Sequence, residues 1–331
     1  MGKMDKGRKR MLLGIGIPAL VVVLLLAFCI FVGNYFYNFA LLRRPQGESS
    51  PAVEANYPEG GMGGGSADVS QSLFSAGEEF KKAVDYEDAY IEAFDGLRLH
   101  GYFIGAPEGS ERYAVVCHGY HSSADTMFGF AERFYAMGYG VLLPDARGHG
   151  QSEGGYVGMG WHERLDIADW SAWLAAREPD CRIALFGVSM GGATVMMAAG
   201  EALPENVRAV VEDCGYSSIR AEFAYQLETL FHLPSFPALH LAGLTAKLRA
   251  GYNFMKEGDA AAQVAKSELP ILFIHGDSDD FVPSDMVYTV YEAAAGEKAL
   301  LVVEGAAHGM ASAADPEAYW AAVETFLARW M

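Results

Sequence analysis

The chain has 331 residues, of which 51% are hydrophobic and 20% charged, so it can build a packed core and lacks the composition of a disordered protein. Its net charge of −18 is unevenly distributed, because residues 1–44 are basic and the remainder carries about −24. An acidic body repels phosphate backbones, which argues against nucleic acid as a partner and against polyanionic substrates.

The first element is an uncharged apolar segment from Met11 to Val32. About 20 apolar residues span the hydrocarbon core of a bilayer as a helix. Five basic residues precede the segment and two follow it, and this bias predicts a single pass through the cell membrane with a cytoplasmic N-terminus and an extracytoplasmic C-terminal part. The alternative, a cleaved signal peptide, would have a shorter apolar region that ends in a small-residue cleavage site.

Aromatic residues follow the apolar segment. Tyr35, Phe36, Tyr37 and Phe39 suit an interfacial aromatic belt, in which the amphipathic rings sit at the level of the lipid headgroups. The sequence therefore predicts a partnership with the lipid bilayer through this N-terminal helix.

Composition divides the chain into four parts. Residues 1–10 form a basic cytoplasmic tail, and residues 11–42 form the transmembrane anchor with its interfacial segment. Residues 43–85 include the glycine-rich run Gly60–Gly65, which favours a flexible tether. Residues 86–331 form the folded domain. Because this core begins near Tyr86, removal of residues 1–44 is expected to release a soluble, active domain.

The folded domain alternates strand-like and helix-like segments. Asp95-Gly96 lies between two strand-like stretches and is a strong signal for a hairpin with a type I′ turn. Purely apolar runs suit parallel strands that are covered on both faces, so the alternation predicts an α/β fold with a mostly parallel sheet. Strands are expected at 114–117, 140–143, 183–186, 207–211, 271–274 and 300–303, and helices at 124–137, 163–176, 191–202, 284–295 and 316–329. Sites in such sheets lie at the carboxyl ends of the strands.

The pentapeptide Gly187-Val188-Ser189-Met190-Gly191 follows one of these strands and opens a helix. This is the context of a nucleophile elbow, in which a strained turn makes the serine hydroxyl project. The flanking glycines allow strand and helix to approach closely, and the free N–H groups of the new helix face a developing oxyanion. The pattern predicts Ser189 as a nucleophile.

A nucleophilic serine needs a general base, and that base needs an orienting carboxylate. His308 lies in a small-residue loop after the last predicted strand, where a catalytic base belongs. Asp277, Asp279 and Asp280 all follow the preceding strand and are candidates for the acid, while Asp213 follows an earlier strand.

Two loops are expected beside this site. The N–H groups of Met190 and Tyr120 are candidates for an oxyanion hole, and His118 is expected to hold its loop by a hydrogen bond. Asp145 and Arg147 are expected to pair and fix the next loop. The four cysteines, Cys29, Cys117, Cys181 and Cys214, have no zinc-site spacing and are expected to be reduced thiols; no metal site or cofactor is predicted.

From about Tyr86 onward, these residues resemble the α/β-hydrolase superfamily, in particular its serine-aminopeptidase-like (S33) and BEM46-like groups. Four motifs and His308 carry the resemblance: His118-Gly119, Asp145-x-Arg147-Gly148-His149-Gly150-x-Ser152, Gly187-x-Ser189-x-Gly191 and His275-Gly276-x-x-Asp279-x-x-Val282-Pro283. The acid of the family falls on Asp279 in the last motif. The resemblance implies an α/β-hydrolase fold and a Ser189–Asp279–His308 triad, but it leaves the substrate undefined.

An insertion at about 215–266 resembles the helical cap of this fold. Its apolar residues are expected to line a pocket for an acyl or aromatic group, with Phe223, Phe231 and Phe236 as pocket residues. The remaining apolar residues of the insertion are expected to pack the cap against the body.

The expected function is that of a membrane-anchored serine hydrolase that cleaves small-molecule acyl esters, including thioesters, through an acyl-enzyme. One alternative is a serine aminopeptidase, which needs a carboxylate for the substrate amine; Glu222 and Glu228 are not clearly placed for that role. The other is a non-catalytic binding protein on a hydrolase scaffold, which the intact triad disfavours. The sequence does not define an oligomeric state.

Overall fold

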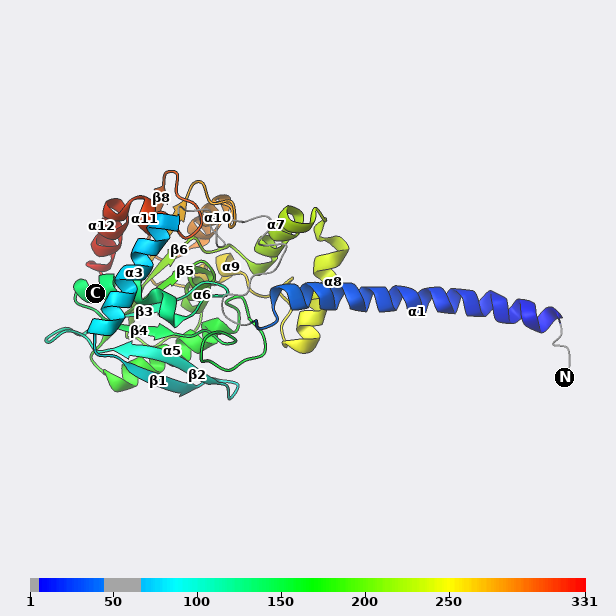
Figure 1. Ribbon diagram of the computed structural model, residues 1–331, viewed down its shortest axis with the longest axis horizontal. Helices are drawn as coiled ribbons and strands as arrows, with labels where there is room; N and C mark the ends of the chain where they lie inside the picture. Colours follow the sequence, from blue (N-terminus) through cyan, green and yellow to red (C-terminus); the bar gives the residue numbers. More distant parts are fainter. Residues whose placement is uncertain (1–5, 45–66) are drawn as a thin grey trace.

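The computed structural model describes residues 6–44 and 67–331. A long helix, α1 (Lys6–Ala40), projects from one side of an α/β body (Figure 1). From Ile17 to Ala40 this helix is long and apolar enough to cross a membrane. The structure thus contains the expected N-terminal apolar helix, while residues 1–5 of the predicted tail lie outside the described residues.

A mixed sheet forms the centre of the body. Its strands are β1 (Glu87–Glu92), β2 (Arg98–Ile104), β3 (Arg112–Cys117), β4 (Gly140–Pro144), β5 (Arg182–Val188), β6 (Val207–Asp213), β7 (Ile271–Gly276) and β8 (Lys298–Val303). The order is β1-β2-β4-β3-β5-β6-β7-β8. β2 pairs antiparallel with both β1 and β4, and the other neighbours are parallel. The predicted mostly parallel α/β sheet is confirmed.

The β1–β2 hairpin is present, but its turn is not of type I′. Gly96 has a φ of +84°, whereas Asp95 is not among the residues with positive φ. The Gly96 N–H donates to the Ala93 oxygen and the Ala93 N–H to the Leu97 oxygen, so the connection is longer than two residues.

Helices cover both faces of the sheet. One face carries α5 (Glu163–Arg177), α6 (Met190–Ala199) and α10 (Asp285–Ala293), and the other carries the 3-10 turn η1 (Ala124–Met127), α4 (Phe128–Ala136), α11 (Ala311–Ala314) and α12 (Pro316–Leu327). Successive strand residues alternate between the two cores: Val115 and Leu185 face the first, and Val116 and Phe186 face the second.

The predicted cap region contains α7 (Ile219–Phe231), α8 (Ser235–Arg249) and α9 (Ala260–Val264). α9 packs against α6 and therefore belongs to the body. α7 and α8 lie on the side of the body from which α1 projects, and α8 crosses α1 (Figure 1). The cap in the strict sense is thus the α7–α8 pair.

The prediction of a tether without structure is wrong for part of its length. Ala67–Ala83 form helix α3, which packs along α4 so closely that a Cβ on Gly77 would lie 2.6 Å from the Gly129 nitrogen. Phe80 and Val84 pack against the core on the same side, so small and apolar residues recur at helical spacing. Residues 45–66, with the glycine run, lie outside the described residues.

The end of α1 belongs to the body rather than to a free interfacial segment. Tyr37 and Leu41 are buried, and the Leu41 oxygen accepts a hydrogen bond from the Val157 N–H at 2.7 Å. Of the four predicted belt aromatics, Tyr35 is exposed, whereas Phe36 and Phe39 pack on a cap residue, as described below. Residues 33–41 are therefore packed against the protein, so the end of the predicted anchor and interfacial segment contacts the folded domain.

Candidate active site

Ser189 lies in a sharp turn between β5 and α6. Its φ of 58° and ψ of −118° fall in a region that side-chain-bearing residues rarely adopt, at a cost on the order of 1–3 kcal/mol. A Cβ on Gly187 would lie 2.2 Å from the Gly191 oxygen, and a Cβ on Gly191 would lie 2.2 Å from the Cys117 oxygen. Glycine is therefore required on both sides of the serine, as the elbow pattern predicts.

The structure brings Ser189, His308 and Asp279 together, although they lie far apart in the sequence. His308 Nε2 is 2.8 Å from Ser189 Oγ, and His308 Nδ1 is 2.7 Å from Asp279 Oδ2. The three residues follow β5, β8 and β7, at the carboxyl edge of the sheet. Because a carboxylate only accepts hydrogen bonds, Nδ1 carries the proton and Nε2 is left to accept the serine O–H.

Asp279 is held as a carboxylate. Burial opposes its ionisation, but the neighbouring His308 and His275 outweigh this effect and lower the pKa of Asp279 far below its usual range. Its Oδ1 accepts the N–H groups of Phe281 at 2.9 Å and Val282 at 2.8 Å. His275 lies on β7 with its Nε2 3.2 Å from Asp279 Oδ2, a contact that its motif did not indicate.

The competing aspartates have other surroundings. Asp277 and Asp280 are exposed, and Asp277 Oδ1 accepts the Gly305 N–H at 2.7 Å, which holds the loop after β8. Asp213 is buried, but its Oδ2 accepts the Tyr319 hydroxyl at 2.8 Å. The geometry therefore favours Asp279 as the partner of the histidine.

Two amide groups lie beside the serine. Met190 begins α6, so its N–H has no acceptor within the helix. A Cβ on Gly119 would lie 3.5 Å from Ser189 Cβ, which places the loop after β3 next to the hydroxyl. Among residues 6–44 and 67–331, neither the Met190 nor the Tyr120 N–H donates to a protein acceptor. This arrangement suits the predicted oxyanion hole.

His118 holds the loop after β3, as expected. Its Nδ1 donates to the Gly119 oxygen at 2.7 Å, and its Nε2 accepts the Ala146 N–H at 3.0 Å. Both bonds are made by neutral imidazole, and burial lowers the pKa of His118. The ring thereby links the loop after β3 to the loop after β4.

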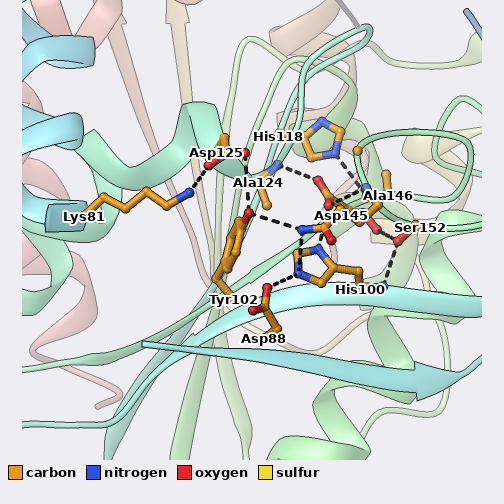
Figure 2. A network of polar contacts seen from close by, with 12 residues as sticks. Lys81, Asp88, His100, Tyr102, His118, Ala124, Asp125, Asp145, Ala146 and Ser152 are labelled. Atoms are coloured by element: carbon orange, nitrogen blue, oxygen red, sulfur yellow. Dashed lines mark hydrogen bonds and ion pairs between the residues drawn. The ribbon is translucent and has the colours of Figure 1, made fainter. Parts of the chain in front are cut away.

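Asp145 and Arg147 do not pair with each other, so that prediction is wrong. Asp145 accepts His100 Nδ1–H at 2.7 Å, with further bonds from the backbone N–H groups of Ala124 at 2.8 Å and Gln151 at 2.9 Å. Figure 2 shows Asp145 between His100 and the Ala124 backbone, with His118 above the same loop. Asp145 therefore fixes its loop by bridging β2, η1 and the residues that follow β4.

Arg147 is fully buried and pairs with two other acids. It donates to Asp166 at 2.7 and 2.6 Å and to Asp95 at 2.8 Å. Burial opposes its charge, but the neighbouring acids outweigh burial and hold the pKa of Arg147 above its usual range. Asp95 lies in the β1–β2 turn and Asp166 on α5, so these partners are brought in by the tertiary fold.

An apolar pocket adjoins Ser189 between the body and the cap. Phe223 and Phe231 line it as predicted, but Phe236 does not: its side chain is 71% exposed, at the start of α8 where the backbone departs from helical geometry. Phe36 and Phe39 of α1 also line the pocket, and their ring centroids lie 5.3 and 5.1 Å from that of Phe231.

The α1 residues were missed because aromatic residues after an apolar span also suit a membrane interface. The available signal was length. A helix of 35 residues extends about 52 Å at 1.5 Å per residue, well beyond the roughly 30 Å of a bilayer core. The excess was available to contact the domain.

Glu222 is the acidic residue that lines this pocket. It is 2% exposed, its Oε1 accepts Gln226 Nε2–H at 3.0 Å, and its Oε2 has no partner among the described residues. Burial raises the pKa of Glu222 to about 8, so the side chain is protonated at neutral pH unless a cation binds.

A thiol also lies near the site. Cys214, Asp279 and His308 present ligand-type atoms within 4.8 Å of one another. Burial raises the pKa of the Cys214 thiol well above its usual value, and the other two side chains are bonded to each other. A metal prefers a thiolate and uncommitted ligands, so this donor set fits a metal poorly.

Comparison with known proteins supports the α/β fold described above. Residues 66–252 match the family model described as X-Pro dipeptidyl-peptidase (S15 family), a range that includes Ser189 but ends before Asp279 and His308. The uncharacterized protein YqkD of Bacillus subtilis is 30% identical over 78% of this chain and 84% of its own length. The uncharacterized protein YfhR of Escherichia coli K12 is 26% identical over 67% of this chain and 73% of its own length.

Among solved structures, the esterase Pf2001 of Pyrococcus furiosus has a TM-score of 0.62 and 26% identity, and covers 76% of this chain and 95% of its own. The α/β-hydrolase assignment made from the motifs is confirmed, and S15 is the family whose model matches. Because that match extends over more than half of the chain, the protein belongs to the X-Pro dipeptidyl-peptidase (S15) family and is a hydrolase of the α/β-hydrolase superfamily.

Proposed function

We propose that this protein is a serine hydrolase that cleaves carboxylic esters, including thioesters, through an acyl-enzyme intermediate. The observation that carries the proposal is the continuous hydrogen-bonded chain from Asp279 through His308 to Ser189 beside an apolar pocket. The esterase Pf2001 among the structural neighbours supports an ester as the substrate bond.

In the acylation step, Ser189 Oγ attacks the ester carbonyl while His308 Nε2 takes the hydroxyl proton. Asp279 stabilises the resulting imidazolium, and the N–H groups of Met190 and Tyr120 bind the oxyanion. His308 then protonates the leaving alcohol or thiol. In the second step, water deprotonated by His308 attacks the acyl-enzyme and releases the carboxylic acid.

Activity on p-nitrophenyl esters of graded chain length tests this function. Because the pocket is apolar, kcat/KM should rise several-fold per CH₂ until the pocket is full and then fall, since each buried CH₂ contributes about 0.8 kcal/mol. Absence of ester turnover by a correctly folded full-length protein, together with efficient cleavage of aminoacyl-anilides, would reject the esterase in favour of a peptidase.

One observation favours a second candidate, an aminopeptidase-type activity. Glu222 places a buried carboxyl group with an unpartnered oxygen in the same pocket as Ser189, and a substrate ammonium would hold it ionised. The matched S15 family is described as a dipeptidyl-peptidase. In this case Glu222→Gln should lower kcat/KM for aminoacyl-anilides by at least tenfold relative to kcat/KM for esters. An equal effect on both substrates would contradict amine binding by Glu222.

We further propose that α1 is an uncleaved membrane anchor, with the N-terminus in the cytoplasm and the hydrolase domain on the outer face of the cell membrane. The apolar helix from Ile17 to Ala40 and the excess of basic residues before it support this topology. Protease added to intact cells should digest the hydrolase domain. Digestion only after lysis would reverse the topology, and a mature chain that begins after residue 30 would indicate a cleaved signal sequence.

A further inference from the structure

The junction between α1 and the cap is tightly packed. A Cβ on Gly33 would lie 2.5 Å from Thr245 Oγ1 and 2.8 Å from the Leu241 oxygen, so α1 and α8 cross in direct contact. Arg249 of α8 donates to Asn38 Oδ1 at 2.7 Å and lies over the Tyr37 ring. The cap thus holds α1 from Gly33 onward.

The part of α1 before this junction has the length of a membrane span. Its large apolar side chains from Ile17 to Phe31 are between 49% and 66% exposed. The uncharged stretch from Met11 to Val32 contains about 22 residues, or roughly 33 Å of helix, against roughly 30 Å for a bilayer core. With α1 as the proposed membrane anchor, the surface of the bilayer falls where α1 meets α8.

The cap presents apolar side chains next to this junction. Leu244 and Leu248 of α8 are 54% and 79% exposed, and their spacing of four residues places them on one face of the helix. Phe236, at the non-helical start of α8, is 71% exposed. That face adjoins the one that contacts α1. An exposed apolar face beside a membrane-spanning helix is explained by burial in the headgroup and acyl boundary of the bilayer.

The pocket extends to the same junction. Phe36 and Phe39 follow directly after the free part of α1, and with Phe231 they form an aromatic wall between the junction and Ser189. Tyr35, on the bilayer side of this wall, is exposed and lies 6.3 Å from the Phe231 ring. The apolar lining of the pocket therefore extends from Ser189 to the aromatic residues of α1 that follow the free part of the helix.

We propose that the substrate is an acyl-ester lipid resident in the bilayer, whose acyl chain enters the pocket from the membrane between α1 and the cap. This inference rests on the proposed esterase function. A chain that moves from lipid directly into an apolar pocket does not cross water, so its hydrophobic free energy is retained throughout. Ser189 Oγ takes the acyl group, the deacylated lipid leaves as an alcohol, and water then releases the fatty acid.

The test uses full-length protein reconstituted into phosphatidylcholine vesicles. One substrate is a phosphatidylcholine with a fluorogenic long-chain acyl ester in the same bilayer, and the other is soluble p-nitrophenyl butyrate. Leu248→Asp alters an exposed residue of the α8 face that lies outside the pocket. It should lower the ratio of bilayer-lipid turnover to soluble-ester turnover at least tenfold. Tyr288→Asp, an equivalent change at a 44% exposed residue of α10, should leave the ratio unchanged.

The outcomes separate the two proposals. If the wild-type protein turns over neither the bilayer lipid nor the soluble ester, and a fluorophosphonate does not label Ser189, the proposed function itself is rejected. Turnover of the soluble ester without turnover of the bilayer lipid rejects the lipid substrate and leaves the esterase intact. A ratio that is the same in Leu248→Asp, Tyr288→Asp and wild type rejects entry from the membrane beside α8.

Discussion

Two aspartate–histidine pairs lie at the same edge of the sheet and have the same geometry. His308 Nδ1 is 2.7 Å from Asp279, and His100 Nδ1 is 2.7 Å from Asp145. Both aspartates also accept two backbone N–H groups, and both are buried. The pairs differ in what the second nitrogen of each histidine contacts.

His308 Nε2 meets the hydroxyl of Ser189, whereas His100 Nε2 meets a second carboxylate, that of Asp88, at 2.9 Å. Burial opposes a charge on His100, but the two acids outweigh burial and raise its pKa. A histidine between two carboxylates keeps its proton and braces a loop (Figure 2), whereas a histidine between a carboxylate and a hydroxyl is able to accept one. The group that contacts Nε2 therefore decides which of the two histidines can act as a catalytic base.

The largest effect is expected when the hydroxyl of Ser189, which contacts His308 Nε2, is removed. Ser189→Ala should lower kcat about 10⁶-fold, because the nucleophile is lost, while the fold persists. A fluorophosphonate should label the wild-type protein and not the variant. Labelling of Ser189→Ala at the wild-type level would place the nucleophile elsewhere.

The acid of the same pair comes next. Asp279→Asn should lower kcat about 10⁴-fold, because the amide cannot hold the Nδ1–H tautomer of His308 or stabilise the imidazolium. Asp277→Asn and Asp280→Asn, at the exposed neighbours, are the matched controls and should retain most of the activity. Equal losses at all three positions would indicate a general effect on the loop.

The end of α1 and the residues that follow it contact both centres, so their removal should affect both pairs. Tyr120 Oη donates to the Ala40 oxygen beside Ser189, and Arg43 donates to the Ser152 oxygen beside Asp145. Deletion of residues 1–44 should lower the free energy of unfolding by about 5 kcal/mol, because Leu41 and other buried side chains are lost. It should also lower ester turnover at least tenfold.

Deletion of residues 1–10 leaves the docked part of α1 intact and is the control for this experiment. Thermal unfolding in detergent and turnover of p-nitrophenyl butyrate are the measurements. A soluble, fully active protein that begins at residue 45 would support the independent tether and anchor that the sequence alone indicates.

Asp145, the aspartate of the pair with His100, should matter for stability rather than for chemistry. Asp145→Asn leaves His100 with a weaker partner and should lower the free energy of unfolding by about 3 kcal/mol, as for other broken buried pairs. Because His100 does not reach Ser189, kcat per folded molecule should fall far less than in Asp279→Asn. Urea unfolding and titration of active sites give the two values, and a 10⁴-fold loss of kcat in Asp145→Asn would erase the distinction between the pairs.

The smallest effect is expected at Asp88, the exposed acid that contacts the other ring nitrogen of His100. Asp88 has a side chain that is 54% exposed, so Asp88→Asn should cost less than about 1 kcal/mol. The pKa of His100 is raised in the folded state, so its contribution is complete below the ordinary histidine pKa of about 6.5 and is lost as the pH rises through the folded-state value. The melting-temperature difference between Asp88→Asn and wild type should therefore be larger at low pH than at high pH. A difference that does not change with pH would contradict a contribution from the titration of His100 beside Asp88.

Sequence reasoning succeeded where a motif itself encodes geometry. The glycines around Ser189 leave one local conformation, and the loops of Asp279 and His308 follow strands whose ends meet at one edge. It failed where the partner is set by tertiary packing. The acids that bind Arg147 come from the β1–β2 turn and α5, and nothing near Arg147 in the sequence identifies them.

Apolar residues posed a second difficulty for sequence reasoning, because the same aromatic pattern fits both a pocket wall and an exposed or membrane-facing surface. Phe39, which follows a long apolar segment, suits a headgroup belt equally well as a pocket wall, and only the position of Phe231 distinguishes the two environments. Phe236 shows the reverse error, since an aromatic residue in a cap suits a pocket or an exposed face. Helix α3 was missed because its residues follow a glycine-rich stretch whose composition favours a coil.

The contact at Gly33 packs α1 directly against the cap of the hydrolase domain, with no linker between them. An enzyme attached by a long flexible linker samples a hemisphere of solution and meets substrates by diffusion in three dimensions. With α1 as the proposed membrane anchor, an enzyme fixed at this joint would hold its pocket at one height and one orientation above the bilayer, and would meet lipids by lateral diffusion in two dimensions. Its rate would then follow the number of substrate molecules per unit of membrane area, and dilution of the vesicles at constant lipid composition would leave the turnover per enzyme unchanged.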